Sequence, residues 1–481
     1  MITRSFATLG LPLALVACGS ATTPDARGPA APPAGASSDL QVASSSPGED
    51  GPAPSSTWIG VAGESAAFLP GTHETFLGVW VDVPERGGGR APVATSVVVD
   101  TSGSMAGDKI VHARAGAKRF LDGLQDGDIA SLVRFDDGAR EIVAPTLLDR
   151  SSRARLTGAV SELSADGATN MFEGIRLGGT HLMNAPASHA VRRIVLLSDG
   201  IATAGPTSRE VLGALADRAA ERGVQVTAIG VGLDYDEGTL NAIAERSSGR
   251  LYHVASSEQL AGLLEEEQKL LRGTRAANAF VDVMPAPNVE ILGIDGARME
   301  RQESGAIRVP LGALFAGQRR EMLVRARITA PSEGTHGLAS VRLHFADPAD
   351  GNLERVQEAV ARYEVTTDPA RVASAKDSRT QAIFAMAEAS RVTRTAADRI
   401  EADRFEEAER DLAAVEKQLA QQQALAKDDK QKERLAANQR MVAQARASAA
   451  GAARAPAAAR PAAKRAAKLE ANDAFMDSAG Y

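Results

Sequence analysis

The feature that most constrains the fold is an alternation of short apolar runs and helical patterns between residues 91 and 272. Runs of Val, Ile and Leu that are apolar on both faces, separated by helices, predict a parallel sheet with helices on both sides. The runs lie at 96–100, 129–135, 193–199, 224–231 and 250–254, and the helical patterns near 108–124, 152–163, 171–183, 207–222, 237–247 and 257–272. Residues 140–148 are expected to add an edge strand.

Patterns typical of antiparallel strands flank this α/β region on both sides. Apolar residues alternate with polar ones in 74–83, where Leu77, Val79 and Val81 share a face, and the alternation returns in 322–328 and 339–345. We infer that the strands of 58–90 join those of 273–367 in a β-sandwich, with the α/β domain of 91–272 inserted between them. The alternative is an α/β domain that is simply followed by the sandwich.

The C-terminal part is rich in good helix formers. In residues 372–448, apolar side chains recur at spacings of three and four from Phe405 to Leu419, which predicts a helical hairpin or small bundle. Residues 449–481 are rich in Ala and Pro, with five Lys or Arg and no acid before Glu470, and we expect a flexible basic tail. Such a tail is either an inert solvated end or a contact for an anionic envelope polymer.

The chain has one cysteine, Cys18, which excludes intramolecular disulfides and cysteine-based zinc or iron–sulfur sites. A basic start followed by the mostly apolar residues 5–17 is too short to span a bilayer but fits a signal-peptide core. The sequence Leu-Val-Ala-Cys at 15–18 resembles the bacterial lipobox. The resemblance implies that residues 1–17 are removed and that Cys18 carries the lipid anchor, while composition predicts a disordered linker over 18–57.

Charge and motifs exclude other classes. A formal charge of −7 does not indicate a nucleic-acid binder. No H-E-x-x-H or G-x-S-x-G motif occurs, so we do not expect an enzyme. Gly19 after the cysteine favours the outer membrane where a host sorts by that residue, and we expect a lipid-anchored protein of the bacterial cell envelope, facing the periplasm or the surface.

Polar residues gather where three predicted strands end. Asp100 ends the first strand, and Ser102 and Ser104 follow on a Gly-containing loop. Thr169 precedes a predicted helix and Asp199 ends another strand. Ligands of open α/β sheets bind outside the carboxyl ends of the strands, so these side chains are expected at a common edge.

This set resembles the metal-ion-dependent adhesion site of von Willebrand factor type A (vWA) domains, whose pattern is D-x-S-x-S. The resemblance covers about residues 91–272 and implies a Rossmann-like fold. It also implies a divalent cation, Mg²⁺ first and Mn²⁺ or Ca²⁺ as alternatives, held by Asp100, Ser102, Ser104, Thr169 and Asp199. Oxygen donors suit such hard cations. Taken singly, each of these residues could instead cap a helix.

By the same resemblance, a carboxylate of a protein partner completes the coordination of the ion. The leading hypothesis is therefore a membrane-anchored lipoprotein that uses the vWA domain for adhesion or protein–protein interaction. The alternatives are a scaffold or assembly factor for an envelope complex and a channel-accessory protein.

Overall fold

The structure is a computed structural model that describes residues 41–44, 57–85, 90–232, 235–254, 257–295 and 297–478. Cys18, the predicted signal peptide and most of the predicted linker lie outside these residues. Within the described part, no helix combines the length and apolarity needed to cross a bilayer.

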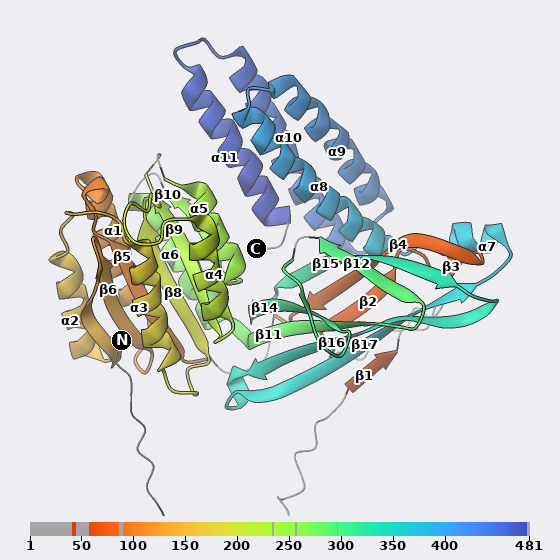
Figure 1. The fold of residues 1–481 in the computed structure, drawn as a ribbon, viewed down its shortest axis with the longest axis horizontal. Coiled ribbons are helices and arrows are strands. Elements are labelled where there is room, and N and C mark those ends of the chain that lie inside the picture. Colours follow the sequence, from red (N-terminus) through yellow and green to blue (C-terminus); the bar gives the residue numbers. More distant parts are fainter. Residues whose placement is uncertain are drawn as a thin grey trace, which may run out of the picture. The chain divides into compact units, whose positions relative to one another are not determined.

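The α/β domain is built on a six-stranded sheet with the strand order β10-β9-β8-β5-β6-β7 (Figure 1). β7 runs antiparallel to β6, whereas the other described pairings of this sheet are parallel. The mostly parallel sheet and its edge strand are thus confirmed. The strands are β5 (Val93–Asp100), β6 (Ile129–Phe135), β7 (Ala139–Leu147), β8 (Val191–Ser198), β9 (Val224–Val231) and β10 (Arg250–Val254).

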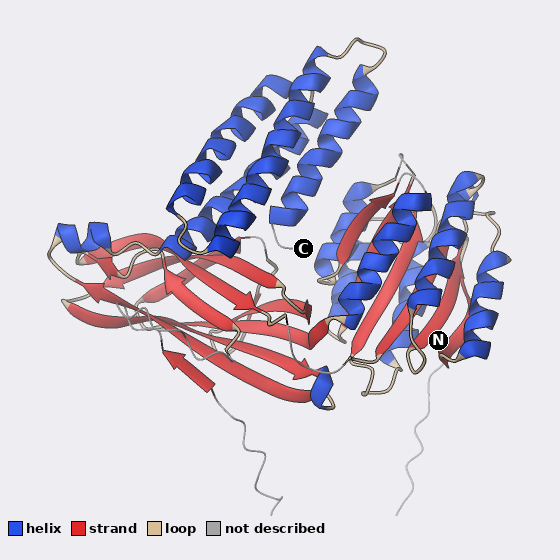
Figure 2. Ribbon diagram, turned by 180° about the vertical axis from the view of Figure 1, so that it is seen from behind, coloured by secondary structure: helices blue, strands red, loops and turns tan. Residues whose placement is uncertain are grey.

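Helices cover both faces of this sheet, as Figures 1 and 2 show from opposite sides. Every residue of β5 is buried, with Val97 packing into one apolar cluster and Val98 into the other, because successive strand side chains point to opposite faces. One face is covered by α1 (Asp108–Gly123), α2 (Arg150–Ser161) and α6 (Ser257–Arg272), and the other by α3 (Met171–Met183), α4 (Arg209–Ala220) and α5 (Glu237–Arg246).

The α/β domain is inserted between strands of a β-sandwich. β2 and β4 precede the domain in the chain, yet they form one sheet with β12 and β15, in the order β12-β15-β4-β2. The facing sheet has the order β1-β17-β16-β11-β14-β13, with β3 also paired to β17. The strands are β1 (Gln41–Ser44), β2 (Ile59–Gly63), β3 (Ala67–Phe68), β4 (Gly71–Asp82), β11 (Thr274–Pro285), β12 (Val289–Asp295), β13 (Glu300–Arg301), β14 (Ile307–Phe315), β15 (Arg319–Ala330), β16 (Gly334–Asp347) and β17 (Leu353–Val365).

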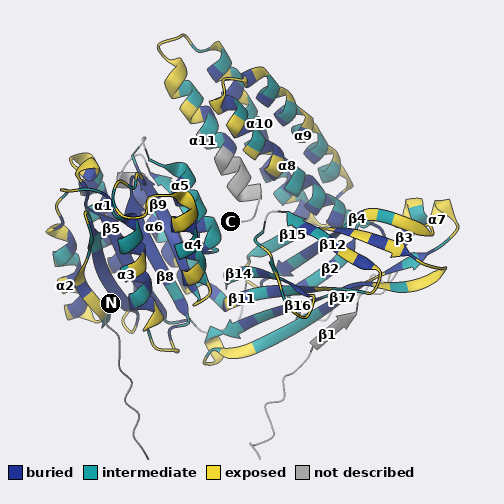
Figure 3. Ribbon diagram, in the orientation of Figure 1, coloured by how far each residue is buried: buried dark blue, intermediate teal, exposed yellow. Residues whose placement is uncertain are grey.

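Alternation along the strands builds the sandwich core. Leu77 and Val79 of β4 are fully buried and belong to one apolar cluster with Val281 of β11 and Val341 of β16, which lie in the opposite sheet. Figure 3 shows buried residues along the strands of both sheets. The alternation seen in 74–83 therefore marks the same core as the later strands.

One short part of the predicted linker is a strand. Gln41 to Ser44 pair in parallel with residues 357–360 of β17, so the expectation of disorder over 18–57 is wrong for these four residues. An edge strand such as β17 has unpaired backbone groups, with which any extended segment within reach can form hydrogen bonds. The composition of the linker does not indicate whether such pairing occurs.

The described C-terminal residues form a bundle of four long helices, which follow the short helix α7 (Pro369–Ser374). Neighbouring helices pack in sequence order, and the last packs back against the first. The predicted helical bundle is therefore confirmed and is larger than expected. Its helices are α8 (Ser378–Glu401), α9 (Phe405–Leu425), α10 (Asp429–Arg454) and α11 (Arg460–Ser478).

The flexible basic tail is a wrong prediction for residues 449–454, which belong to α10, and for residues 460–478, which form α11. Ala467 and Ala471 are fully buried in the bundle core, where their small side chains fit between helices. Alanine has the highest helix propensity of the amino acids, and here tertiary packing adds to that propensity. Lys464 also donates to Asp403 at 2.9 Å, so part of the basic character is neutralised.

The bundle is seated on the outer face of the β12-β15-β4-β2 sheet through α8. Phe76 and Phe384 pack ring against ring with centroids 4.8 Å apart. Arg379 lies over the Trp80 ring, 4.3 Å from its centroid, and donates to both carboxylate oxygens of Asp82 at 2.8 and 2.9 Å. Stacking and bidentate pairing together fix the direction of α8 on the sheet.

A substitution at Gly78 tests the packing of α8 on this sheet. A Cβ at Gly78 would lie 2.9 Å from side-chain atoms of Ile383 and Thr380 and 3.2 Å from the Thr380 Cα. We expect Gly78→Ala to lower the free energy of unfolding by about 1 kcal/mol because the helix must move off the sheet. Urea unfolding measures this. Gly158→Ala is the control, since open space surrounds Gly158 on α2 and alanine should stabilise that helix. A Gly78→Ala protein as stable as the wild type would contradict the close packing of α8 on the sheet.

Candidate metal centre

Asp100 is the last residue of β5 and its carboxylate is fully buried. Its Oδ1 accepts the backbone N–H of Ser102 at 2.9 Å, and its Oδ2 accepts the hydroxyl of Ser198 at 2.5 Å. Ser198 ends β8, the strand next to β5, and its own oxygen accepts the Gly200 N–H at 2.9 Å. The carboxylate is therefore oriented by two strands at the carboxyl edge of the sheet.

Ser102 and Ser104 belong to the tight turn that follows β5. Their Oγ atoms are 3.0 Å apart, with Ser102 buried and Ser104 exposed, and the fully buried Met105 anchors the turn. Adjacent ligands of an octahedral ion with bonds of about 2.1 Å lie about 3.0 Å apart, since they subtend a right angle at the metal. The two hydroxyls are hydrogen bonded to each other, and the spacing of their oxygens also matches that geometry.

Thr169 lies on a neighbouring loop that is tied to the first. Gly103 N–H donates to the Gly167 carbonyl at 2.9 Å, and the Thr169 backbone exchanges hydrogen bonds with Thr203 at 2.9 and 3.0 Å. Thr169 is buried, with 2% of its surface exposed. The loops that carry Ser102, Thr169 and Asp199 are thus held together by backbone hydrogen bonds.

Asp199 follows β8 and is fully buried. Its Oδ2 accepts Lys109 Nζ at 2.9 Å, whereas its Oδ1 is buried and has no hydrogen-bond partner among the described residues. A buried carboxylate oxygen without a partner is costly in a folded protein. A cation bound beside this oxygen would remove that cost.

The electrostatics of Asp100 also favour a cation. Burial is the main cause that raises the pKa of Asp100 from 3.8 to about 6; hydrogen bonds from Ser102 and Ser198 oppose the rise, and the charge of Asp199 adds to it. Burial therefore makes the charged form of Asp100 less stable than that of an exposed carboxylate when the site holds no cation. A divalent ion would supply positive charge beside the carboxylate and favour its charged form.

The alternative that these residues cap helices does not hold for the two aspartates. The N-cap of α1 is Gly107 and that of α4 is Ser208, while Asp100 and Asp199 cap neither helix. Ser102 is the N-cap of the short 3₁₀ turn Gly103–Met105, but its side chain makes no capping hydrogen bond.

Two acids of the adjoining loop have structural partners. Asp136 pairs with Arg134 at 2.8 Å, and Asp137 accepts the Ala168 N–H at 3.0 Å. Asp108 is the exposed first residue of α1.

The donor set decides which ions would fit. Among the described residues, no three His, Cys, Asp or Glu side chains come together as a metal cluster. A cation at this edge would therefore be held by two carboxylates and by hydroxyls, the oxygen donors that suit Mg²⁺, Mn²⁺ or Ca²⁺. The structure brings Asp100, Ser102, Ser104 and Asp199 together and places Thr169 on the adjoining loop; their role as ligands stays a prediction.

Sequence reasoning did not identify Ser198 or Thr203. The available signal for Ser198 was its position: it directly precedes Asp199, and its hydroxyl lies at the end of the strand next to the one that carries Asp100. Thr203 gave none, because its bond to Thr169 joins loops 34 residues apart.

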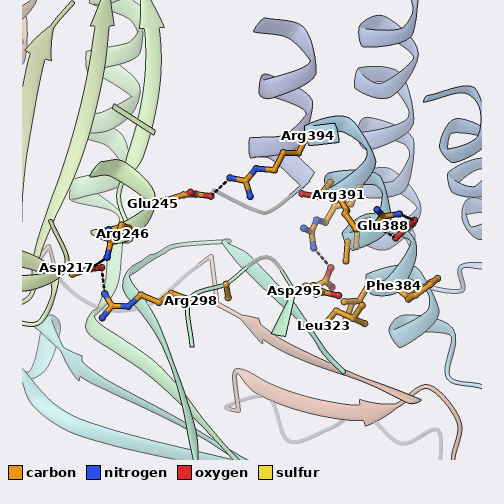
Figure 4. A pocket seen from close by; sticks show the side chains of 17 residues that line it. Asp217, Glu245, Arg246, Asp295, Arg298, Leu323, Phe384, Glu388, Arg391 and Arg394 are labelled. Atoms are coloured by element: carbon orange, nitrogen blue, oxygen red, sulfur yellow. Dashed lines mark hydrogen bonds and ion pairs between the residues drawn. The ribbon is translucent and has the colours of Figure 1, made fainter. Parts of the chain in front are cut away.

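A separate hollow of about 540 Å³ lies among α4, α5, α8 and the residues that follow β12 (Figure 4). Its charged side chains pair with one another: Arg298 with Asp217 at 2.5 Å, and Arg394 with Glu245 at 3.5 Å. None of the predicted metal ligands lines it.

Comparison with known proteins agrees with the fold. The family model described as von Willebrand factor type A domain matches residues 96–266. An uncharacterised protein of Synechocystis, sll0103, is 25% identical over 58% of this chain and 69% of its own length. The uncharacterised protein YfbK of Escherichia coli is 23% identical over 51% of this chain and 44% of its own length, so the chain spans less than half of that relative.

A solved structure, described as von Willebrand factor type A from Catenulispora acidiphila, superposes with a TM-score of 0.64 at 18% identity. It covers 81% of this chain and 90% of its own. At that identity the likeness concerns the fold. The chain thus contains a vWA domain, a domain typical of protein–protein interaction or adhesion.

Proposed function

We propose that this protein binds a protein partner through a divalent cation held by Asp100, Ser102, Ser104, Thr169 and Asp199, with an acidic side chain of the partner as a further ligand. The observation that carries the proposal is the buried Asp199 Oδ1 without a partner, at the edge where two serine hydroxyl oxygens lie 3.0 Å apart. Mg²⁺ is the first candidate, because it prefers six oxygen ligands near 2.1 Å.

The exposure of Ser104 indicates where a partner would approach. Asp100, Asp199 and Thr169 are buried, whereas Ser104 faces solvent at the carboxyl edge of the sheet. When bound, the cation would supply positive charge at this edge, and the chain's own residues would orient it. Neutral hydroxyl ligands leave the ion attractive to an incoming carboxylate.

Affinity capture from the native envelope tests the proposal. Partners retained by the intact wild-type protein in Mg²⁺ should be released by EDTA, and the Asp100→Ala variant should retain few of them in either buffer. The exposed Asp126, which pairs with Arg153 at 2.9 Å on the same domain, provides the Asp126→Asn control. Capture that ignores both EDTA and Asp100→Ala would sink the metal-bridged mechanism.

We further propose that the protein is anchored in the bacterial cell envelope through a lipid on Cys18, with the outer membrane favoured. The lipobox resemblance and the matches to bacterial proteins support this location. Cys18→Ser should move the protein from the membrane fraction to the soluble fraction without a change in its affinity for the cation. Membrane association that persists in Cys18→Ser would contradict the anchor.

A second candidate function is a scaffold for an envelope complex, which the firm seat of the bundle on the sandwich favours. On that hypothesis, Asp100→Ala would leave a copurifying complex intact. The channel-accessory alternative has no observation of its own. The hypothesis that the basic C-terminus contacts an anionic polymer loses support, because Lys464 pairs with Asp403 and Lys468 pairs with Glu401.

A further inference from the structure

Lys109 is the second residue of α1 and reaches back to the candidate metal centre. Its Nζ lies 2.9 Å from Asp199 Oδ2, and its side chain is 28% exposed while that of Asp199 is 1% exposed. The lysine stem runs beside Gly232, where a Cβ would lie 3.0 Å from the Lys109 Cε. Gly232 also has a φ of 94°, which favours glycine, so the path of the stem is kept open.

We propose that Lys109 sets the charge of the metal centre: it balances Asp199 when no cation is bound and keeps the loaded centre positive, so that the centre attracts a carboxylate. This inference rests on the proposed function. Two carboxylates and one ammonium group give 1 − 2 = −1, and a divalent cation brings the centre to +1. Without the lysine the loaded centre would be neutral.

The charge of Lys109 should have a large effect because it lies beside a buried carboxylate. Charges in water are screened within about 10 Å, but a buried pair is screened much less. Asp199 is fully buried, whereas Asp108, Asp137 and Asp166 of the surrounding loops face solvent. Two half-buried acids nearby have partners of their own: Asp136 pairs with Arg134, and Asp236 accepts hydrogen bonds from Thr239. Lys109 is in direct contact with one of the two ligand carboxylates, so its charge is expected to influence a cation at this edge strongly.

Two opposite changes should follow from Lys109→Met, which keeps most of the apolar stem and removes the charge. Cation affinity should rise about tenfold or more, because repulsion between the ammonium group and the ion is lost. Affinity of the loaded centre for a carboxylate should fall by about the same factor, because the centre changes from +1 to neutral.

The metal-free protein should respond differently. In Lys109→Met without a cation, Asp199 is left buried with neither oxygen paired among the described residues, so the Tm should fall. Saturating Mg²⁺ should return the Tm to that of the loaded wild type. A lysine that only anchors the start of α1 would lower the Tm equally with and without Mg²⁺.

The experiment uses the intact chain with Mn²⁺ alone, followed by acetate as the smallest carboxylate probe. Calorimetric titration gives the Mn²⁺ affinity, and the loss of water-proton relaxation at bound Mn²⁺ reports acetate binding. Lys109→Arg retains the charge and should resemble the wild type in both readouts. Lys118→Met removes one charge elsewhere on α1 and should also leave both readouts unchanged.

The outcomes separate the two proposals. Higher Mn²⁺ affinity together with weaker acetate binding in Lys109→Met supports the inference. Unchanged affinities in Lys109→Met, with a wild type that binds Mn²⁺, overturn the inference and leave the proposed function in place. A wild type that binds no Mn²⁺ overturns the proposed function and the inference with it.

Discussion

Glu267→Leu is expected to destabilise the α/β domain by about 3–5 kcal/mol, the usual result of leaving one partner of a buried ion pair without the other. Arg193 of β8 and Glu267 of α6 are each 1% exposed, with Arg193 Nε 3.4 Å from Glu267 Oε1. Burial lowers the pKa of Arg193, and the charge of Glu267 opposes that effect. Without Glu267, the guanidinium would be buried beside Thr227 with no acid to balance it.

Thermal unfolding of the domain measures the effect. A loss of this size should lower the Tm by about 6–20 °C in a domain of 150–250 residues. The control is Glu265→Leu on the same helix, because Glu265 pairs with Arg119 at the surface, where such pairs contribute little.

A double variant tests the cause of the destabilisation. Arg193→Met combined with Glu267→Leu should regain most of the lost stability, since an apolar pair replaces the buried charges. A double variant no more stable than Glu267→Leu would show that the loss comes from packing or from the hydrogen bonds that Thr227 and Tyr252 donate to Glu267, and not from the ion pair. A neutral Glu267→Leu would contradict the buried pair itself.

Saturating Mg²⁺ is expected to raise the Tm of the metal-free protein by about 5–10 °C. A ligand at one hundred times its Kd stabilises the folded state by about 2.7 kcal/mol, and each kcal/mol shifts the Tm of a domain of this size by about 2–4 °C. The shift should vanish in Asp100→Asn. Scanning calorimetry measures it, with NaCl of equal ionic strength as the reference.

The metal-free Asp100→Asn protein should be at least as stable as the wild type. Burial disfavours the charged Asp100, whose pKa is raised to about 6, so a neutral amide in its place relieves that cost above pH 6. Asp126→Asn should keep the full Mg²⁺ shift. An equal shift in Asp100→Asn would exclude Asp100 as a ligand.

The regular elements of the fold could be predicted from sequence wherever burial leaves a periodic pattern. β5 is apolar on both faces because both are covered, and Leu77, Val79 and Val81 alternate because one face of β4 lies in the sandwich core. Helix α11 could not be distinguished from a flexible tail, because an alanine-rich sequence fits both until Ala467 and Ala471 find a surface to pack against.

In the candidate site too, local features could be predicted from the sequence and contacts between distant residues could not. The spacing of Asp100, Ser102 and Ser104 is local, so one short segment predicts it. The contacts that shape the site are distant in sequence: Ser198 to Asp100 joins residues 98 apart, and Lys109 to Asp199 joins residues 90 apart. A single sequence contains no local signal for such pairs, since they depend on which strands become neighbours.

The most direct test of the metal centre is an electron paramagnetic resonance titration of the intact protein with Mn²⁺. We predict that the first equivalent of Mn²⁺ loses its free-ion signal, that Mg²⁺ restores the signal by competition, and that Asp100→Ala leaves the signal free from the first addition. A wild-type protein that leaves Mn²⁺ free, or an Asp100→Ala variant that binds it equally well, would contradict the proposed metal centre.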